Sequence, residues 1–163
     1  MNKAYLLIGG NVGNRQENLH SANHLLQTSC GEIGLRSHLY ETAAWGKTDQ
    51  PPFLNQALLL LTGLTAQMLL QKILAAESQM GRERAEKYGP RVIDIDILFF
   101  NDDIIQKPGL VIPHPEIRNR RFALTPLCEI APGLVHPVFL KTIEQLLEEC
   151  PDELEVKKFS TNN

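Results

Sequence analysis

The stretch VIDIDILFF at residues 92–100 decides the fold of this chain. β-Branched and aromatic residues fill it almost throughout, which predicts a β-strand that is covered on both faces. Because side chains alternate along a strand, Asp94 and Asp96 point to one face, together with Val92 and Leu98. The opposite face is expected to carry Ile93, Ile95, Ile97 and Phe99.

The two aspartates are the most unusual feature of this strand. Carboxylates side by side in an apolar run repel each other and lose hydration. A divalent cation removes both penalties, and Mg²⁺ bound by one or two carboxylates usually completes its shell with phosphate oxygens. An Asp-X-Asp sequence also arises by chance in a strand whose polar face ends in water, so the neighbouring residues must decide between the two interpretations.

Arginine-rich segments flank the aspartates on both sides. Residues 82–91 contain four basic and two acidic side chains, a local net charge of +2. Arg118, Arg120 and Arg121 follow the strand, just after His114. Guanidinium groups bind phosphate oxygens through two hydrogen bonds at a time, and metal ions bridge the remaining oxygens. The combination therefore predicts a site for a polyphosphate.

Length and composition limit the possible functions. The chain has 163 residues, enough for one domain with a substantial core, and we expect a single domain over residues 1–163. A net charge of −3 gives the whole molecule no electrostatic basis for binding nucleic acid. We see no signal peptide and no membrane span, and the three cysteines form no C-X-X-C pair. These features predict a cytoplasmic protein with reduced thiols and no membrane partner.

Periodicity and capping residues predict the other elements. Asn14 and Thr65 are expected to cap two helices, and Gly81 ends the second of them. These helices should span about residues 14–28 and 65–80, with strands at 3–8, 31–41 and 53–62. Residues 104–112 should be extended, helical periodicity returns at 122–130 and 140–149, and the chain should be frayed from about residue 157.

This order of elements, β-α-β-β-α-β with further helices, predicts an α+β, ferredoxin-like fold. We expect a mainly antiparallel sheet with helices packed on it and extra C-terminal helices. In the second strand, Ile33, Leu35 and Leu39 should share one face. The ferredoxin-like fold hosts many activities, so function has to be argued from individual residues.

Three polar features stand among apolar residues. Glu77 continues the helical stripe of Ile73 and Leu74, so we expect either a buried carboxylate with an arginine partner or an exposed one at a frayed helix end. Asn55 is either a structural amide or a group that reads the polar edge of a ligand. The turn at residues 9–13 could hold a phosphate, but a tight structural turn is favoured because no complete phosphate-binding motif is present.

Two adjacent motifs carry a family resemblance. Lys87-Tyr88-Gly89-Pro90-Arg91, followed by Asp94-Ile95-Asp96-Ile97-Leu98, resembles the signature of the 6-hydroxymethyl-7,8-dihydropterin pyrophosphokinases, enzymes of folate biosynthesis. Further matches extend to about residue 150 and include Tyr40-Glu41-Thr42, Gln50-Pro51-Pro52-Phe53-Leu54-Asn55, Gly81-Arg82, Pro113-His114 and Asn119-Arg120. The resemblance implies transfer of pyrophosphate from ATP to the hydroxymethyl group of the pterin, with release of AMP.

The resemblance also implies a set of site residues. Asp94 and Asp96 would hold two Mg²⁺ ions, and Arg82 and Arg91 would act with them in catalysis. The ATP side would comprise Glu77, Arg82, Arg84, Tyr88, Arg91, Ile97, His114 and Arg120. The pterin side would comprise Thr42, Ala43, Trp45, Phe53, Asn55, Asp94 and Phe122. A monomer that acts on small molecules is expected, and segments 43–52 and 81–91 match loops that close over the substrates in the family.

Some residues depart from the family pattern, and two other functions share parts of it. Gly10 replaces a common Ser, Ala43 a Pro, Tyr88 a Trp and Pro115 a Tyr. A two-metal nucleotidyltransferase also uses an Asp pair, but its Gly-rich helix start lies shortly before the pair, whereas here Gly9-Gly10 precedes Asp94 by more than eighty residues. A non-catalytic ferredoxin-like ligand-binding module has little reason to surround carboxylates with arginines.

Overall fold

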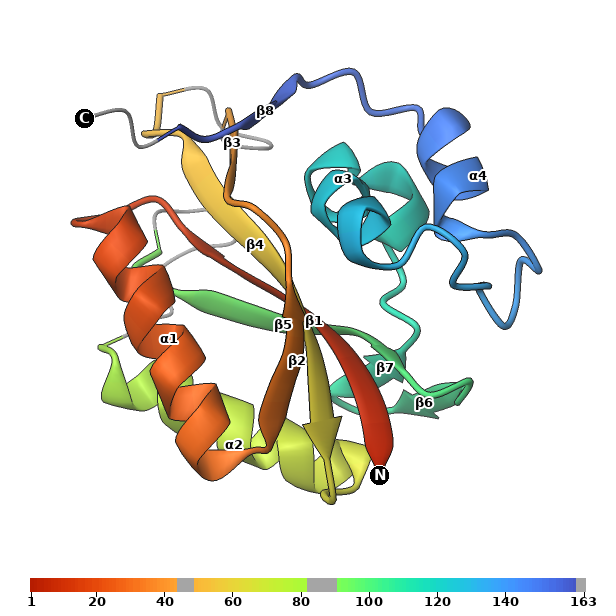
Figure 1. The fold of residues 1–163 in the computed structure, drawn as a ribbon, viewed down its shortest axis with the longest axis horizontal. Coiled ribbons are helices and arrows are strands. Elements are labelled where there is room, and N and C mark those ends of the chain that lie inside the picture. The colour runs from red at the N-terminus through yellow and green to blue at the C-terminus, as the bar shows by residue number, and fades with distance from the viewer. Residues whose placement is uncertain (44–48, 82–90, 161–163) are drawn as a thin grey trace.

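An antiparallel sheet forms the centre of the molecule (Figure 1). The computed structural model describes residues 1–43, 49–81 and 91–160. Within them the strand order is β5-β1-β4-β3-β8, and β2 also pairs with β4. The strands of this sheet are β1 (Asn2–Gly10), β2 (Glu32–Arg36), β3 (Tyr40–Thr42), β4 (Phe53–Thr62), β5 (Asp94–Phe100) and β8 (Val156–Lys158).

Helices enclose the sheet on both faces (Figure 1). On one face, α1 (Arg15–Ser29) and α2 (Ala66–Gln79) contribute Leu26 and Ile73 to a core with Ile8 of β1. On the other face, α3 (Arg121–Ile130) and α4 (Ile143–Glu148) form a second core that includes Leu7 and Leu124. Because side chains alternate along β1, neighbouring residues of one strand supply both cores.

The connections complete a ferredoxin-like arrangement. β4 lies between β1 and the β2–β3 segment, and β1 lies between β4 and β5, so each β-α-β unit has one strand inserted into it. After β5 come a separate hairpin, β6 (Ile105–Lys107) and β7 (Leu110–Ile112), and a short 3₁₀ helix, η1 (Ile117–Asn119). The predicted α+β fold, with an antiparallel sheet and helices packed on it, is confirmed.

The predicted helix ends are confirmed by their capping contacts. The Asn14 side chain accepts a hydrogen bond from the backbone N–H of Glu17 at 3.1 Å, and Thr65 accepts one from Met68 at 3.2 Å. Gly81 follows α2 with a φ of 83°, a conformation in which a residue with a Cβ would be strained. Local sequence therefore defines where these two helices begin and where the second one ends.

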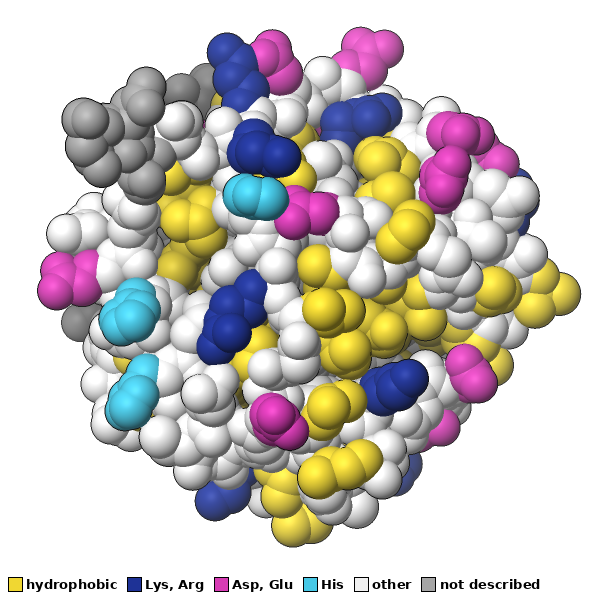
Figure 2. Space-filling view, in the orientation of Figure 1, with side chains coloured by type: hydrophobic (Ala, Val, Ile, Leu, Met, Phe, Trp, Pro, Cys, Tyr) yellow, Lys and Arg dark blue, Asp and Glu magenta, His cyan; other side chains and the backbone are white. Residues whose placement is uncertain are grey.

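The second predicted strand is divided, which corrects the assignment of its faces. β2 ends at Arg36 and β3 begins at Tyr40, and the pairing of β2 with β4 shifts register between Ile33 and Leu35. A bulge of this kind interrupts side-chain alternation. Leu35, expected in the core with Ile33, is consequently 46% exposed, whereas Tyr40 is buried. In Figure 2, hydrophobic side chains gather on the side of the molecule that faces the viewer, beside β2 and below α3.

A register shift also corrects the prediction for Phe99. The pairing of β1 with β5 shifts between Tyr5 and Leu6, so that Leu98 is left without a directly opposed residue. Beyond this point the faces exchange, and Phe99 joins the core under α3 and α4 while Phe100 joins the core under α1 and α2. Sequence alternation alone cannot reveal an inserted residue.

Two smaller expectations were also wrong. In α2, Leu74 is 40% exposed and Leu69 is fully buried in its place, because the helix turns a slightly different stripe toward the sheet. The segment from Lys157 was expected to be frayed, but Val156–Lys158 pairs with β3. Phe159 extends this contact, since its N–H donates to the Leu39 carbonyl at 2.7 Å.

A carboxylate on α3 joins this helix to the β3 edge. Glu129 accepts hydrogen bonds from the Tyr40 hydroxyl at 2.6 Å and from the His38 backbone N–H at 3.2 Å, and its Oε2 lies 2.8 Å from His38 Nδ1. Partial burial favours the neutral acid, but the hydrogen bonds from Tyr40 and His38 outweigh it and lower the pKa of Glu129. The ionised carboxylate therefore stabilises the contact between α3 and the sheet.

Replacement of this carboxylate should weaken the fold in a pH-dependent manner. We expect Glu129→Gln to lower the free energy of unfolding by about 1–2 kcal/mol at neutral pH, because charge-assisted hydrogen bonds are lost. Since the folded-state pKa lies below the ordinary value of 4.5, the contribution is present above that pH and disappears as the pH falls through the folded-state pKa.

Urea unfolding of both proteins across this pH range measures the difference. Glu153→Gln, which replaces an exposed carboxylate, is the matched control and should leave stability nearly unchanged. A difference between wild type and Glu129→Gln that stays constant down to pH 3 would contradict the assignment.

Candidate active site

A row of paired residues crosses three strands at one end of the sheet. Gly9 of β1 pairs with Asn55 of β4 on one side and with Asp94 of β5 on the other. Two residues earlier in β1, Leu7 pairs with Asp96. Directly paired residues point to the same face of a sheet, so the two aspartates and Asn55 share the face of Leu7, which is covered by α3 and α4.

The two carboxylates are half-buried and have a cation close by. Asp94 and Asp96 point to the same face, as expected from their spacing. Arg91 Nε lies 4.0 Å from Asp94 Oδ2, and the two side chains are 16% and 35% exposed. This arrangement keeps negative charge accessible beside a largely covered guanidinium group. Such a site suits a ligand that brings both cations and anionic oxygens.

Glu77 holds the backbone between the two aspartates. Its side chain is 4% exposed, and Oε2 accepts a hydrogen bond of 2.7 Å from the backbone N–H of Ile95. β5 is the terminal strand of the sheet beside β1, so an N–H on its outer side needs an acceptor from outside the sheet. Of the two alternatives left open for Glu77, the structure shows the buried one, with a backbone N–H as a partner. Arg82 and Arg84, which follow the helix and were candidate partners, lie outside the described residues.

His114 is positioned as a neutral hydrogen-bond donor. Its backbone N–H donates to the Leu98 carbonyl at 2.9 Å, which attaches it to the end of β5. Its Nδ1 accepts from the Glu116 backbone N–H at 3.1 Å, so the ring proton of the neutral form resides on Nε2. Burial, assisted by the positive charge of Arg120, lowers the pKa of His114 to about 4. At neutral pH this residue offers an N–H group without adding charge.

The residues of the predicted pterin side gather on the α3 face. Phe53 pairs with Thr42, and Asn55 follows Phe53 by two residues, so these three side chains point the same way. Asn55 is 5% exposed and Thr42 is 4% exposed. The Thr42 hydroxyl donates to the Glu155 carbonyl at 3.2 Å. Ala43 is exposed just after β3. The first turn of α3 carries Phe122, half-buried against the core of this face.

Not every predicted residue lies with this group. Arg120 precedes α3, and its guanidinium carbon lies 5.7 Å from the centroid of the Phe122 ring. This contact joins a residue of the predicted ATP side to one of the predicted pterin side. Ile97 belongs to the core under α1 and α2, on the opposite face from the aspartates. Trp45, Arg82, Arg84 and Tyr88 lie outside the described residues.

Close contacts require glycine at positions 9 and 10. The sequence predicts these residues only as part of a tight turn. A Cβ on Gly9 would lie 1.8 Å from Asn55 Oδ1, and a Cβ on Gly10 would lie 2.2 Å from the Val92 carbonyl oxygen. The structural interpretation of this turn therefore accounts for both glycines. At position 10, glycine is the one residue that leaves the Val92 backbone undisturbed.

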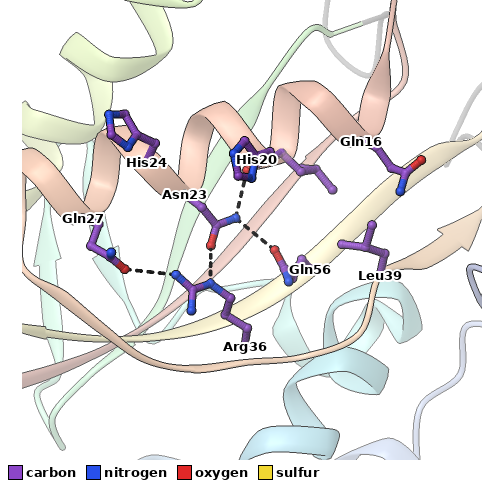
Figure 3. Close-up of a pocket in the computed structure, with 9 residues that line it drawn as sticks. Gln16, His20, Asn23, His24, Gln27, Arg36, Leu39 and Gln56 are labelled. Atoms are coloured by element: carbon purple, nitrogen blue, oxygen red, sulfur yellow. Dashed lines mark hydrogen bonds between the residues drawn. The ribbon is translucent and has the colours of Figure 1, made fainter. Parts of the chain in front are cut away.

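A polar pocket of about 470 Å³ lies on the other side of the sheet (Figure 3). Its polar side chains bond one another: Arg36 donates to Asn23 Oδ1 at 2.8 Å and to Gln27 Oε1 at 3.0 Å, and Asn23 donates to Gln56 Oε1 at 3.1 Å. This network joins α1 to β2 and β4. Because none of the predicted site residues lines it, we assign it a structural role.

The described residues carry neither a ready-made metal cluster nor a membrane-spanning helix. In residues 1–43, 49–81 and 91–160, no group of three or more His, Cys, Asp or Glu side chains is arranged to hold a metal ion. The described helices also include none with the length and apolar character required to cross a membrane.

The charge state of His114 leads to a prediction about stability. An unfolded histidine takes up a proton near pH 6.5, whereas the folded one resists protonation until about pH 4. The stabilising effect of this neutral ring is thus present above pH 6.5 and declines as the pH falls toward 4. In chemical unfolding experiments, His114→Asn should flatten the pH dependence of stability in this interval, while His20→Asn, at an exposed histidine, should not. Equal slopes for wild type and His114→Asn would mean that the folded ring is charged.

The comparisons with known proteins agree with this geometry. A sequence model of the 7,8-dihydro-6-hydroxymethylpterin-pyrophosphokinase (HPPK) family matches residues 5–132. A 2-amino-4-hydroxy-6-hydroxymethyldihydropteridine pyrophosphokinase from Methylorubrum extorquens is 44% identical over 136 residues, covering 83% of this chain and 86% of the relative. One from Aquifex aeolicus is 40% identical over 149 residues, covering 91% and 92%.

Solved structures show the same fold. A Plasmodium falciparum HPPK-DHPS crystal structure superposes with a TM-score of 0.75 at 22% sequence identity, over 91% of this chain. This chain spans 44% of the length of that protein. At this identity the likeness concerns the fold alone, whereas the sequence matches extend over most of the chain. The chain therefore belongs to the 7,8-dihydro-6-hydroxymethylpterin-pyrophosphokinase family.

Proposed function

We infer that this protein transfers pyrophosphate from ATP to the hydroxymethyl group of 6-hydroxymethyl-7,8-dihydropterin and releases AMP, a step of folate biosynthesis. The observation that carries the inference is the row Asn55–Gly9–Asp94, in a chain that belongs to a pyrophosphokinase family. This row places an amide suited to a heterocycle and a carboxylate suited to a metal–phosphate complex on the two strands that flank β1. The reaction requires these two chemistries side by side.

Asp94 and Asp96 are proposed to hold magnesium. They fit this ion because they share a face, remain half-exposed and are only two, which leaves coordination positions for phosphate oxygens and water. When bound, Mg²⁺ supplies neutralisation of triphosphate charge. We propose two ions, as the family resemblance implies.

The phosphate side is proposed to use three kinds of contact. Arg91 lies beside Asp94 and can pair with phosphate oxygens without moving away from the aspartate. His114 donates through Nε2–H as a neutral group. Glu77 contributes by holding the Ile95 backbone between the aspartates. The remaining ATP contacts are assigned by resemblance to Arg82, Arg84, Tyr88, Ile97 and Arg120.

The pterin is proposed to lie between the sheet and the start of α3. Asn55 would bond the amide edge of the ring, and Phe53 and Phe122 would stack on its two faces. The Thr42 hydroxyl is bonded to the Glu155 carbonyl, so this residue would line the pocket with its methyl group and backbone. Ala43 and Trp45 complete the pterin side by resemblance. In this pose the hydroxymethyl group points toward Asp94.

The chemistry then consists of one displacement at phosphorus. The pterin hydroxyl oxygen bonds to the β-phosphorus of ATP and releases its proton to solvent water. The bond from that phosphorus to the oxygen that bridges it to the α-phosphate breaks, and AMP leaves with the bonding electrons. The contributions of Arg91 and His114 are orientation of the triphosphate and stabilisation of the charge that develops on its oxygens. The expected catalyst is therefore a rigid arrangement of charges, with no covalent enzyme intermediate.

A single incubation distinguishes this function from its alternatives. With MgATP and hydroxymethyl-dihydropterin, a pyrophosphokinase forms AMP and pterin diphosphate without free pyrophosphate. A nucleotidyltransferase would release pyrophosphate, and a ligand-binding module would leave ATP intact. Either of these last two results would exclude the proposed function.

Loss of one aspartate should abolish most activity while sparing the fold. We expect Asp96→Ala to lower turnover by about a hundred- to a thousandfold, because charge stabilisation at the phosphates is lost. Its thermal unfolding should change little, since the side chain is half-exposed. Asp102→Ala, at an exposed aspartate in the turn after β5, is the matched control. Turnover within threefold of wild type in Asp96→Ala would rule out the metal assignment.

The contact between Gly9 and Asn55 allows a test of the pterin side. Gly9→Ala should displace the Asn55 amide, because the new Cβ would overlap its Oδ1. We expect pterin affinity to fall about 10- to 100-fold, the equivalent of roughly 1–3 kcal/mol for a lost buried hydrogen bond, with a smaller change in affinity for an ATP analogue. Fluorescence titration with pterin and calorimetry with the nucleotide measure the two affinities.

Gly34→Ala is the control for this experiment, since a Cβ at that position meets Leu61 at an ordinary 3.6 Å. Equal losses of affinity for both ligands in Gly9→Ala would indicate general distortion of the site rather than displacement of Asn55.

A further inference from the structure

One buried amide connects the proposed pterin side with the proposed phosphate side. Asn11, directly after β1, is 2% exposed. Its Nδ2 donates to Gln50 Oε1 at 3.1 Å and to the Pro51 carbonyl at 2.9 Å. Its Oδ1 accepts from the backbone N–H of Arg91 at 2.9 Å, and its own backbone N–H donates to the Arg91 carbonyl at 2.9 Å. The side chain thus bonds segments 40 and 80 residues away in sequence.

These contacts begin where the strand pairing stops. The ladder between β1 and β4 ends with Gly10 opposite Leu54, and the ladder between β1 and β5 ends with Gly9 opposite Asp94. Asn11 is the first residue after β1. Its contacts join β1 to the segments before β4 and β5, beyond the ends of both ladders. Among the described residues, two other contacts lie beside it: the Val12 N–H donates to the Arg91 carbonyl at 3.2 Å, and Arg15 of α1 donates to the Pro52 carbonyl at 3.0 Å. Asn11 is the residue that contacts both segments.

Both attached segments lead directly into site residues. Pro51 precedes Phe53 by two residues, and Arg91 precedes Asp94 by three. The two bonds from Nδ2 therefore set the position of the chain that enters the pterin side. The bond to Oδ1 sets the position of Arg91 beside the carboxylates. One planar amide fixes the distance between these two segments.

We propose that Asn11 is a positioning residue that holds the pterin and phosphate sides of the site in register. The proposal rests on the pyrophosphokinase function, because transfer requires the pterin hydroxyl to meet the β-phosphorus in line with the leaving oxygen. A displacement of about 1 Å in such a reaction costs roughly a hundredfold in rate. Asn11 touches neither reacting group and acts through Gln50, Pro51 and Arg91.

The two ends of the amide can be separated by substitution. Asn11→Asp keeps an oxygen to accept the Arg91 N–H but places its second oxygen against the Pro51 carbonyl, which can only accept, so it loosens the pterin side alone. Asn11→Ala releases both sides. Asn18→Asp is the matched control, because Asn18 Nδ2 also donates to a nearby backbone carbonyl, that of Val12 at 3.0 Å, without joining distant segments.

Amide hydrogen exchange tests the proposed contacts independently of activity. Asn11→Asp should accelerate exchange in peptides that cover residues 49–54 and leave the Arg91 amide protected. Asn11→Ala should accelerate both, and Asn18→Asp neither. Unchanged exchange at residues 49–54 in Asn11→Asp would overturn the proposal, whatever the enzyme catalyses.

Steady-state kinetics then test the functional consequence, well below the melting temperature of each variant. We expect Asn11→Asp to lower kcat about 10- to 100-fold and to raise the KM for pterin more than the KM for ATP. A purely structural residue would lower the folded fraction but leave kcat per folded molecule unchanged, and that result would overturn the proposal. An equal loss in Asn18→Asp would overturn it as well.

Gln50→Ala covers the case in which Asn11 variants fail to fold. It removes one of the two bonds on the pterin side and leaves the Arg91 side intact. A smaller loss in kcat, of about three- to tenfold, with faster exchange limited to residues 49–54 is expected. Wild-type kcat in Gln50→Ala would contradict the proposed connection, while inactivity of the wild-type protein itself would instead refute the proposed function.

Discussion

The close approach of three chain segments at the end of β1 is the constraint on which the site depends. Gly9 and Gly10 leave the space that the Asn55 amide and the Val92 carbonyl occupy. A side chain at either position would separate β4 or the start of β5 from β1. Because the proposed pterin and phosphate contacts lie on β4 and β5, the two strands that flank β1, the missing Cβ atoms keep both chemistries close to β1, with only that strand between them.

Charge at this site is arranged so that a polyphosphate can complete it. Asp94 and Asp96 provide negative charge for metal ions, and Arg91 provides positive charge at 4.0 Å from one of them. His114, which is kept neutral by burial, adds a hydrogen-bond donor without adding repulsion toward the metal ions that we propose there. Glu77 is buried, and its Oε2 accepts from the backbone N–H of Ile95. The two acids that remain half-exposed are therefore the ones that we propose for magnesium.

The two faces of the sheet perform different tasks. Under α1 and α2 the side chains form an apolar core, and a polar network around Arg36 fixes α1 to β2 and β4. Under α3 the core stops short of the strand ends, where Asn55 and the aspartates lie. Glu129, near the end of α3, joins this helix to β3 through the Tyr40 hydroxyl. The reactive groups are thereby mounted on rigid elements.

Much of the site could be predicted from the sequence, because strand alternation and helix capping are local properties. The shared face of Asp94 and Asp96 follows from a period of 2 residues, and the place of Glu77 on the apolar stripe of α2 follows from a period of 3.6. The capping of α2 by Thr65 follows from the hydroxyl of that residue. The family motifs add ordered spacings that composition alone cannot provide. These features depend on residues that are close in the chain.

Only the tertiary structure decided the remaining features, since each depends on contacts between distant segments. Bulges moved Leu35 and Phe99 to faces that alternation did not predict, and a cross-strand neighbour explains why Gly9 has no side chain. The neutral state of His114 arises from burial, and the contacts of Asn11 reach across 40 and 80 residues. The sequence by itself determined which side chains share a face of each element, whereas register and packing determined which of them meet, because those depend on how the elements are placed against one another.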